Sequence, residues 1–195
     1  MITKLNNKAV ANVTTLPVAL GDMVFISSAT ASASASIEFS LGSYKEYKFL
    51  FVNMHPSTND IRFQFNCSID NGSNYNVVKT TTYFYAYNGE GGGTGVLGYS
   101  TGSDIAQGTG YQDISGSIGN QNDETFSGTL QLFNPSSTTY VKHFITSGNT
   151  YTQDDFSQQT NIAGYFNDTN DLTNIKFQMA SGNIDAGKIL MFGIN

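Results

Sequence analysis

The sequence is poor in charged residues, in cysteine and in proline, and it contains no tryptophan. Only 9 basic residues stand against 15 acidic ones, which gives a net charge of −6 and an isoelectric point of about 4.6. Binding to nucleic acids and to anionic membranes depends largely on lysine and arginine, so this balance argues against both kinds of partner. We therefore expect a protein that binds neither nucleic acid nor membrane.

Long apolar runs are missing as well. No stretch approaches the roughly 20 apolar residues that span a bilayer. No apolar segment of the kind found in signal peptides follows Lys4 and Lys8. We therefore expect the chain to fold in the cytoplasm in which it is made.

The single cysteine, Cys67, excludes an internal disulfide, and no Cys-x-x-Cys pattern of a metal or redox site is present. A chain of this length buries roughly 70% of the surface that its unfolded form exposes, so its stability requires neither a disulfide nor a metal site. In the segment 61–69 apolar and polar residues alternate, and Cys67 occupies one of the apolar positions. This pattern predicts a buried thiol that packs as a small hydrophobic group.

Patterns that carry catalysis are also absent. The two histidines, His55 and His143, accompany no Gly-x-Ser-x-Gly motif. The adjacent acids Asp123 and Glu124 would point to opposite faces of a strand. Oxygen-rich segments at 154–155 and 167–171 lack the EF-hand pattern, and we treat calcium binding there as the weaker alternative to ordinary turns. We therefore expect no enzyme, no cofactor and no metal.

The residues that are abundant favour strands and turns. Thr, Tyr, Phe, Val and Ile suit strands, while Gly, Asn and Ser suit turns. Alternation of apolar and polar residues, or short apolar runs, predicts strands at 24–28, 31–39, 47–53, 61–69, 75–87, 112–118, 125–133, 139–147, 157–166, 173–180 and 187–194. The segment 47–53 is apolar on both faces, which predicts a central strand. Asn71 and Gly72 predict a tight turn that makes a hairpin of 61–69 and 75–87.

This pattern predicts an all-β fold, because no amphipathic helix and no repeat of fixed period is visible. We expect a jelly-roll-like antiparallel β-sandwich of about 8–10 strands, in two sheets of about four, over residues 23–195. Residues 1–22, interrupted by Pro17, are expected to form an N-terminal arm. Residues 88–110 are expected to form a long glycine-rich loop.

Three segments are the expected contact elements: the arm, the small-residue strand at 31–36 and the glycine-rich loop. Their candidate contact residues are Leu5, Val10, Val13, Leu16, Pro17, Ala31, Ala33, Gly91, Gly92, Gly93, Val96 and Leu97. An alternative is ligand binding, in which tyrosine rings would stack on a sugar. The candidates for that role are Tyr83, Tyr85, Tyr87, Tyr99 and Tyr111.

Three segments carry a resemblance to a known class of proteins. Residues 46–76 (EYKFLFVNMHPSTNDIRFQFNCSIDNGSNYN), 127–144 (SGTLQLFNPSSTTYVKHF) and 162–166 (IAGYF) resemble small virion proteins of tailed phages, particularly marine ones. The resemblance spans about residues 23–195. It implies a β-sandwich and a particle-associated role, and it carries over no catalytic residue.

The resemblance implies a phage virion structural protein located in the virion, of the capsid decoration, cement or head-fibre type, that stabilises or covers the particle surface. Its expected partners are further copies of itself, the major capsid protein and other virion proteins. Closed symmetry is the rule for such assemblies, and the habits of jelly-roll virion proteins, rather than any residue, suggest a trimer. The alternative is a tail-associated protein that binds a receptor or a carbohydrate.

Deletion of residues 1–22 is expected to leave a folded domain that no longer attaches to particles, because the arm matches neither the strand pattern nor the resemblance. Thermal unfolding checks the fold, and binding to empty particles checks attachment. Full occupancy by the truncated chain would contradict the expectation.

Overall fold

Strands account for every regular element in the computed structural model, which describes residues 23–93 and 95–195. They are β1 (Val24–Thr30), β2 (Ile37–Ser40), β3 (Glu46–Pro56), β4 (Phe63–Ser68), β5 (Lys79–Gly89), β6 (Val96–Tyr99), β7 (Gln112–Asp113), β8 (Phe126–Phe133), β9 (Lys142–Tyr151), β10 (Phe156–Phe166), β11 (Asn174–Met179) and β12 (Ile184–Ile194). The all-β class is therefore confirmed. The expected arm contacts Leu5, Val10, Val13, Leu16 and Pro17 lie outside the described residues.

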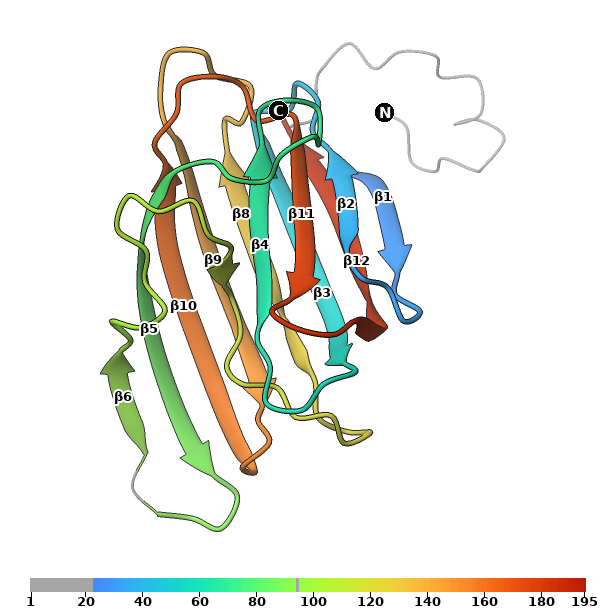
Figure 1. Cartoon of the computed structure of the whole chain (residues 1–195), viewed down its shortest axis with the longest axis vertical. Coiled ribbons are helices and arrows are strands. Elements are labelled where there is room, and N and C mark those ends of the chain that lie inside the picture. Colours follow the sequence, from blue (N-terminus) through green and yellow to red (C-terminus); the bar gives the residue numbers. More distant parts are fainter. Residues whose placement is uncertain (1–22, 94) are drawn as a thin grey trace, which may run out of the picture.

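The strands form two antiparallel sheets that face each other (Figure 1). One sheet has eight strands in the order β1-β12-β3-β8-β9-β10-β5-β6, and the other has four in the order β2-β11-β4-β7. The prediction of about 8–10 strands in sheets of about four is thus too low for the first sheet. The additional strand β6 lies within the expected loop 88–110, where it pairs with β5.

Eight of the strands are connected in the order of a jelly roll. In the large sheet β1, β12, β3 and β8 are neighbours, and in the small sheet β2, β11, β4 and β7 are neighbours. Strands from the two ends of the chain are therefore interleaved in both sheets, as the paired Greek keys of a jelly roll require. The remaining strands β9, β10, β5 and β6 extend the large sheet beyond β8.

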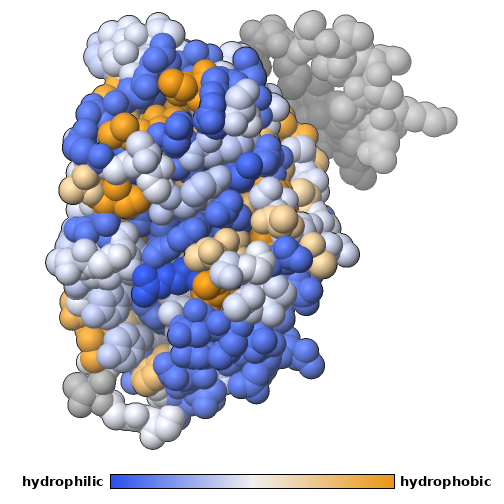
Figure 2. Space-filling view, viewed as in Figure 1, coloured by the Kyte–Doolittle hydropathy of each residue, from blue (hydrophilic) through white to orange (hydrophobic). Residues whose placement is uncertain are grey.

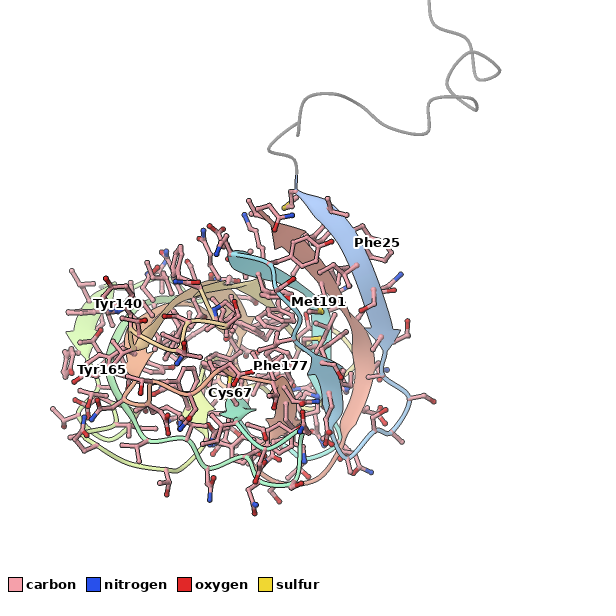
Figure 3. All side chains as sticks on the ribbon, turned by 90° about the horizontal axis from the view of Figure 1, so that it is seen from above. Phe25, Cys67, Tyr140, Tyr165, Phe177 and Met191 are labelled. Carbon is pink, nitrogen blue, oxygen red and sulfur yellow. The ribbon has the colours of Figure 1, made fainter. Side chains whose placement is uncertain are left out.

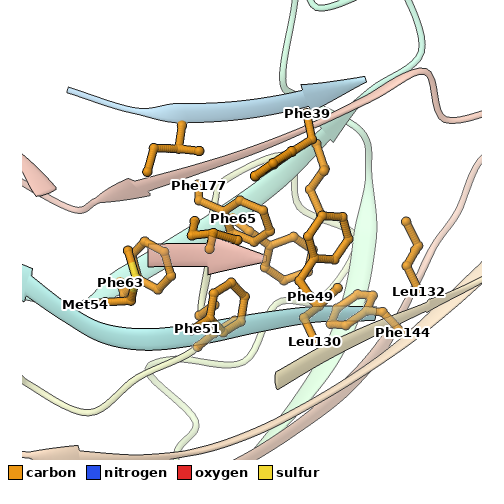
Figure 4. Close-up of a cluster of buried hydrophobic side chains, with 14 of the residues drawn as sticks. Phe39, Phe49, Phe51, Met54, Phe63, Phe65, Leu130, Leu132, Phe144 and Phe177 are labelled. Atoms are coloured by element: carbon orange, nitrogen blue, oxygen red, sulfur yellow. The ribbon is translucent and has the colours of Figure 1, made fainter. Parts of the chain in front are cut away.

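Phenylalanine side chains from both sheets fill the space between them (Figure 4). Phe51 of the large sheet lies 5.2 Å from Phe177 of the small sheet, measured between ring centroids. Phe65 and Phe144 approach to 5.0 Å with nearly perpendicular rings. Cys67 is fully buried beside this cluster, as the alternation predicts. Each such ring contributes roughly 1.5–3 kcal/mol through burial.

A loop instead of a strand covers the inner side of β10 and β5. The Tyr83 hydroxyl donates a hydrogen bond of 2.7 Å to the carbonyl of Ser115, and the Thr160 hydroxyl donates one of 2.9 Å to Ile114. The strand expected at 112–118 is correspondingly reduced to β7. The loop follows the sheet through these side-chain hydrogen bonds, so most of it needs no ladder pairing.

The segment 31–36 is not a strand, contrary to the alternation of alanine and serine. Ala33 has a positive φ of 48°, and Ser34 makes a single isolated bridge to Ile184. These residues carry the chain from β1 in the large sheet to β2 in the small sheet. Ala31, Ala33 and Ser34 still donate backbone hydrogen bonds to β12, but these bonds do not form a regular ladder. The period of two continues into β2, where apolar side chains large enough to fix a strand begin.

The turn after β4 forms with the expected residues but does not make a hairpin. Asn71 and Gly72 have φ values of 58° and 84°, as a tight reversal requires. Hydrogen bonds from Ser68 and Asn74 lower the pKa of Asp70 to about 2. However, β4 and β5 belong to different sheets. Turn chemistry fixes the local backbone angles but not the strand with which the chain pairs next.

Two lysines are buried on either side of Phe166, at the same level of the large sheet. The ammonium of Lys79 donates to the carbonyl of Gly110 at 2.5 Å and lies 5.6 Å from the Phe166 ring centroid. The ammonium of Lys142 donates to the carbonyls of Asp168 and Asn170. Both lysines therefore hold a loop at this end of the sheet, and burial lowers the pKa of Lys79 to about 8.

The free energy of unfolding should depend on pH through Lys79. Its folded pKa of about 8 lies below the ordinary value of 10.5, so the unfolded chain binds more protons between these two pH values. Stability on this account rises from pH 8 to pH 10.5, by up to about 3 kcal/mol. Urea denaturation of the wild type and of Lys79→Met across this range measures the difference. An identical pH dependence in both proteins would contradict the assignment.

Candidate interaction surface

The large sheet has one face in the core and one face that no described residue covers. We call the second the outer face. Along β3 the side chains of Tyr47, Phe49 and Phe51 are buried, while Lys48 and Val52 point the other way. The prediction of a central strand is confirmed, since β3 lies between β12 and β8, although one face of the strand is only half-buried or exposed. Figure 3 shows the sheet curving around Cys67 and Phe177, with Phe25 at its β1 edge.

Strand pairing brings side chains from the whole width of the sheet into rows on the outer face. One continuous row is Ser28, Leu190, Leu50, Thr129, Ser147, Asn161, Phe84 and Tyr99. The row is polar but uncharged in the middle and apolar towards both ends. The outer face therefore combines a neutral centre with two apolar borders.

The apolar border on the β6 side includes the most exposed large hydrophobic side chain on this face. Leu97 is 82% exposed, and Phe84 packs against Tyr99 at a centroid distance of 5.1 Å. Ile145, further inside the sheet, is 52% exposed. By contrast, the side of the molecule that carries the small sheet is dominated by hydrophilic residues, with hydrophobic ones scattered among them (Figure 2).

The border on the β1 side is a run of four exposed apolar residues. Met23, Val24, Phe25 and Ile26 are all exposed, and the Phe25 ring touches Phe192 with a centroid distance of 5.6 Å. We call residues 23–26, together with the unpaired side of strand β1, the β1 edge. Sequence reasoning located a short apolar strand here but assigned it no role.

A hollow of about 510 Å³ lies on the outer face where β3 and β12 are both interrupted by bulges. Asn53 has a positive φ of 50° there, and a Cβ on Gly187 would lie 2.6 Å from the Asn53 carbonyl oxygen. His55 is 3.0 Å from the carbonyl of Gln121 through Nε2 and 3.8 Å from Asp185 through Nδ1. We call this the bulge hollow.

The bulge hollow offers hydrogen-bonding groups and one His–carboxylate pair, without an aromatic ring to stack a sugar. Bulges leave little trace in a period-two pattern, so sequence reasoning missed the site. The signal that was available is the loss of alternation after Val52. His143 lies elsewhere on the outer face, next to Tyr165 at a centroid distance of 6.1 Å.

The five candidate ligand-binding tyrosines do not converge. Tyr83 is buried, and burial raises the pKa of its hydroxyl. Tyr85 and Tyr87 stack at 5.9 Å on the inner side of β5, whereas Tyr99 lies on the outer face and Tyr111 in the loop before β7. Tyr87 lines a hollow of about 260 Å³ that it shares with Phe156 and four polar residues.

The expected contact residues outside the arm also lie in different places, and one of them is buried. Ala31 is buried, so its side chain cannot contribute to a surface, while Ala33 is exposed in the crossing between the sheets. Gly91, Gly92 and Gly93 lie in the open turn after β5, with free space where a side chain would be. Val96 and Leu97 are exposed on β6.

Comparisons of the chain with protein-family models, with curated proteins and with solved structures found no match. Among the described residues, no group of three or more His, Cys, Asp or Glu side chains is placed to hold a metal ion. No helix of membrane-spanning length and hydrophobicity occurs in residues 23–93 and 95–195.

The neighbours Phe144 and Ile145 test the assignment of the two faces. Phe144→Ala should lower the free energy of unfolding by about 3–5 kcal/mol because it opens a cavity in the core. Ile145→Thr should change it by less than about 0.5 kcal/mol, since the side chain is on the outer face and the β-branched shape is kept. Urea denaturation at low protein concentration measures both values. A large loss in Ile145→Thr would show that the outer face is covered within the monomer.

Proposed function

We propose that this chain is a structural subunit of a phage particle, of the capsid decoration, cement or head-fibre type. The observation that carries the proposal is the outer face, a surface eight strands wide with an uncharged centre and apolar borders. The resemblance of the sequence to small virion proteins is the reason for proposing that this particle is a phage.

The composition of the outer face is what supports a role in assembly. The cores of protein interfaces are depleted in charge and enriched in aromatic residues. Phe25, Phe84 and Tyr99 are exposed on this face, whereas the charged side chains of its central strands are few. Contiguous exposed apolar surface on a soluble protein marks a contact more often than chance.

The jelly-roll strand order supports the same role. Strands from the two ends of the described chain are interleaved in both sheets, which suits a subunit that must persist outside a cell. Its partners in this proposal are further copies in a closed oligomer, for which we keep the trimer as the expectation, and the major capsid protein.

Reconstitution on particles tests this proposal. Purified protein added to particles that lack it should bind saturably, and Ile145→Asp should weaken that binding at least about tenfold, or about 1.4 kcal/mol, by placing a charge in the contact. Ser181→Asp, in the exposed loop after β11, is the matched control and should bind as the wild type does. No binding by the wild type would refute the particle role, and equal binding by Ile145→Asp would remove the outer face from it.

A second candidate is a tail-associated protein that binds a receptor or carbohydrate. The observation in its favour is the hollow that Tyr87 and Phe156 share, in which the two rings lie 5.1 Å apart beside Asp154 and Gln158. Aromatic rings next to hydrogen-bonding groups suit a sugar. Binding to a glycan array that is lost in Tyr87→Ala but retained in Ile145→Asp would favour this candidate over the first.

A further inference from the structure

The two sheets have four edge strands, and three of them are protected in ways that natural proteins commonly use. The edges are β1 and β6 of the large sheet and β2 and β7 of the small one. Strands β6 and β2 have 4 residues each and β7 has 2, so each offers few backbone groups to another strand. Strand β2 also carries Glu38, which forms an ion pair of 2.7 Å with Lys176.

Strand β1 lacks these protections. It has 7 residues, none of them charged and none of them proline. Strand β12 pairs with one side of β1, and no strand of the described chain pairs with the other. The one protective feature is a bulge between Phe25 and Ser27. An edge of this kind is a template for a strand from another chain.

We infer that the β1 edge pairs with the β1 edge of a second copy of this chain, antiparallel and about a two-fold axis. Two neutral strands can face each other in this way without like charges meeting. The exposed apolar run meets itself when the two-fold axis passes near Phe25, because this position sets Val24 of one copy opposite Ile26 of the other. The large sheets of the two copies then continue into each other.

The contact is small and should therefore be reversible. Two strands of this length bury less than the roughly 1,200 Å² at which stable specific interfaces begin. We expect a dimer that dissociates on dilution.

This inference describes one contact between copies within the proposed assembly. It rests on the proposed function in one respect, because a particle would bring the copies together at high local concentration. Its test is made in solution without particles. A dimer in solution with no particle binding would refute the proposed function alone, and particle binding by a protein that stays monomeric at all concentrations would refute this inference alone.

Analytical ultracentrifugation of the full chain over a wide concentration range is the first test. The wild type should show a monomer–dimer equilibrium, and Ile26→Lys should weaken it at least about tenfold because a lysine on an edge opposes strand addition. Leu97→Lys, which places the same charge on the opposite edge of the same sheet, is the matched control and should leave the equilibrium unchanged. Circular dichroism and thermal unfolding check that both variants fold.

A cysteine at the expected two-fold axis tests the geometry. The exposed Phe25→Cys should form a disulfide-linked dimer under mild oxidation, because an axis near this residue sets its two copies opposite each other. The native Cys67 is fully buried and does not compete. Leu97→Cys should remain unlinked.

Three results would overturn the inference. A wild-type chain that is monomeric at every concentration refutes it. A full chain that is monomeric but dimerises after deletion of residues 1–22 assigns the β1 edge to the chain's own N-terminal segment. Loss of the dimer in Leu97→Lys but not in Ile26→Lys moves the contact to β6.

Discussion

The ring of Phe177 is the contact on which the rest of the structure depends. It comes from β11 in the small sheet and is fully buried. Its centroid lies within 6.3 Å of the centroids of five other rings, those of Phe39, Phe49, Phe51, Phe63 and Phe65. Two of these rings belong to the large sheet and three to the small one. This cluster holds the two sheets together opposite β3, and the contact of Phe65 with Phe144 extends it towards β9.

The position of this cluster explains why the large sheet has two differently covered halves. The small sheet packs over β3 and its neighbours, while β10, β5 and β6 continue beyond it. Their inner side would expose Tyr83 and Ile162 to water, and the loop before β8 covers it through hydrogen bonds from side-chain hydroxyls. The strands added to the jelly roll therefore widen an outer face that the described chain leaves uncovered.

The alternation of apolar and polar residues predicted most of the strands and the class of fold, because the side chains of a half-buried strand point alternately to the core and to solvent. Cys67 and Ile175 follow that rule. The pairing of strands was not predictable in the same way. Residues 31–36 alternate as well as any strand but cross between sheets, and Asn71-Gly72 makes its turn without making a hairpin. The bulge hollow was missed for a related reason, since the positive φ of Asn53 depends on the close approach of Gly187 from a strand more than a hundred residues away.

The β1 edge and the outer face meet at one corner of the molecule, and their chemistry is linked there. Phe25 lies on the outer face and on the edge strand at once, and its ring packs on Phe192 of β12. A charge on β1 would protect the edge but would also interrupt the apolar border of the face. The other three edges are short, and a short strand presents few backbone groups whatever its side chains are. Strand β1 is long because it completes the jelly-roll sheet beside β12, and it remains uncharged along its whole length. A long neutral edge promotes uncontrolled association unless a specific strand covers it. The proposed pairing of two β1 edges would supply such a strand.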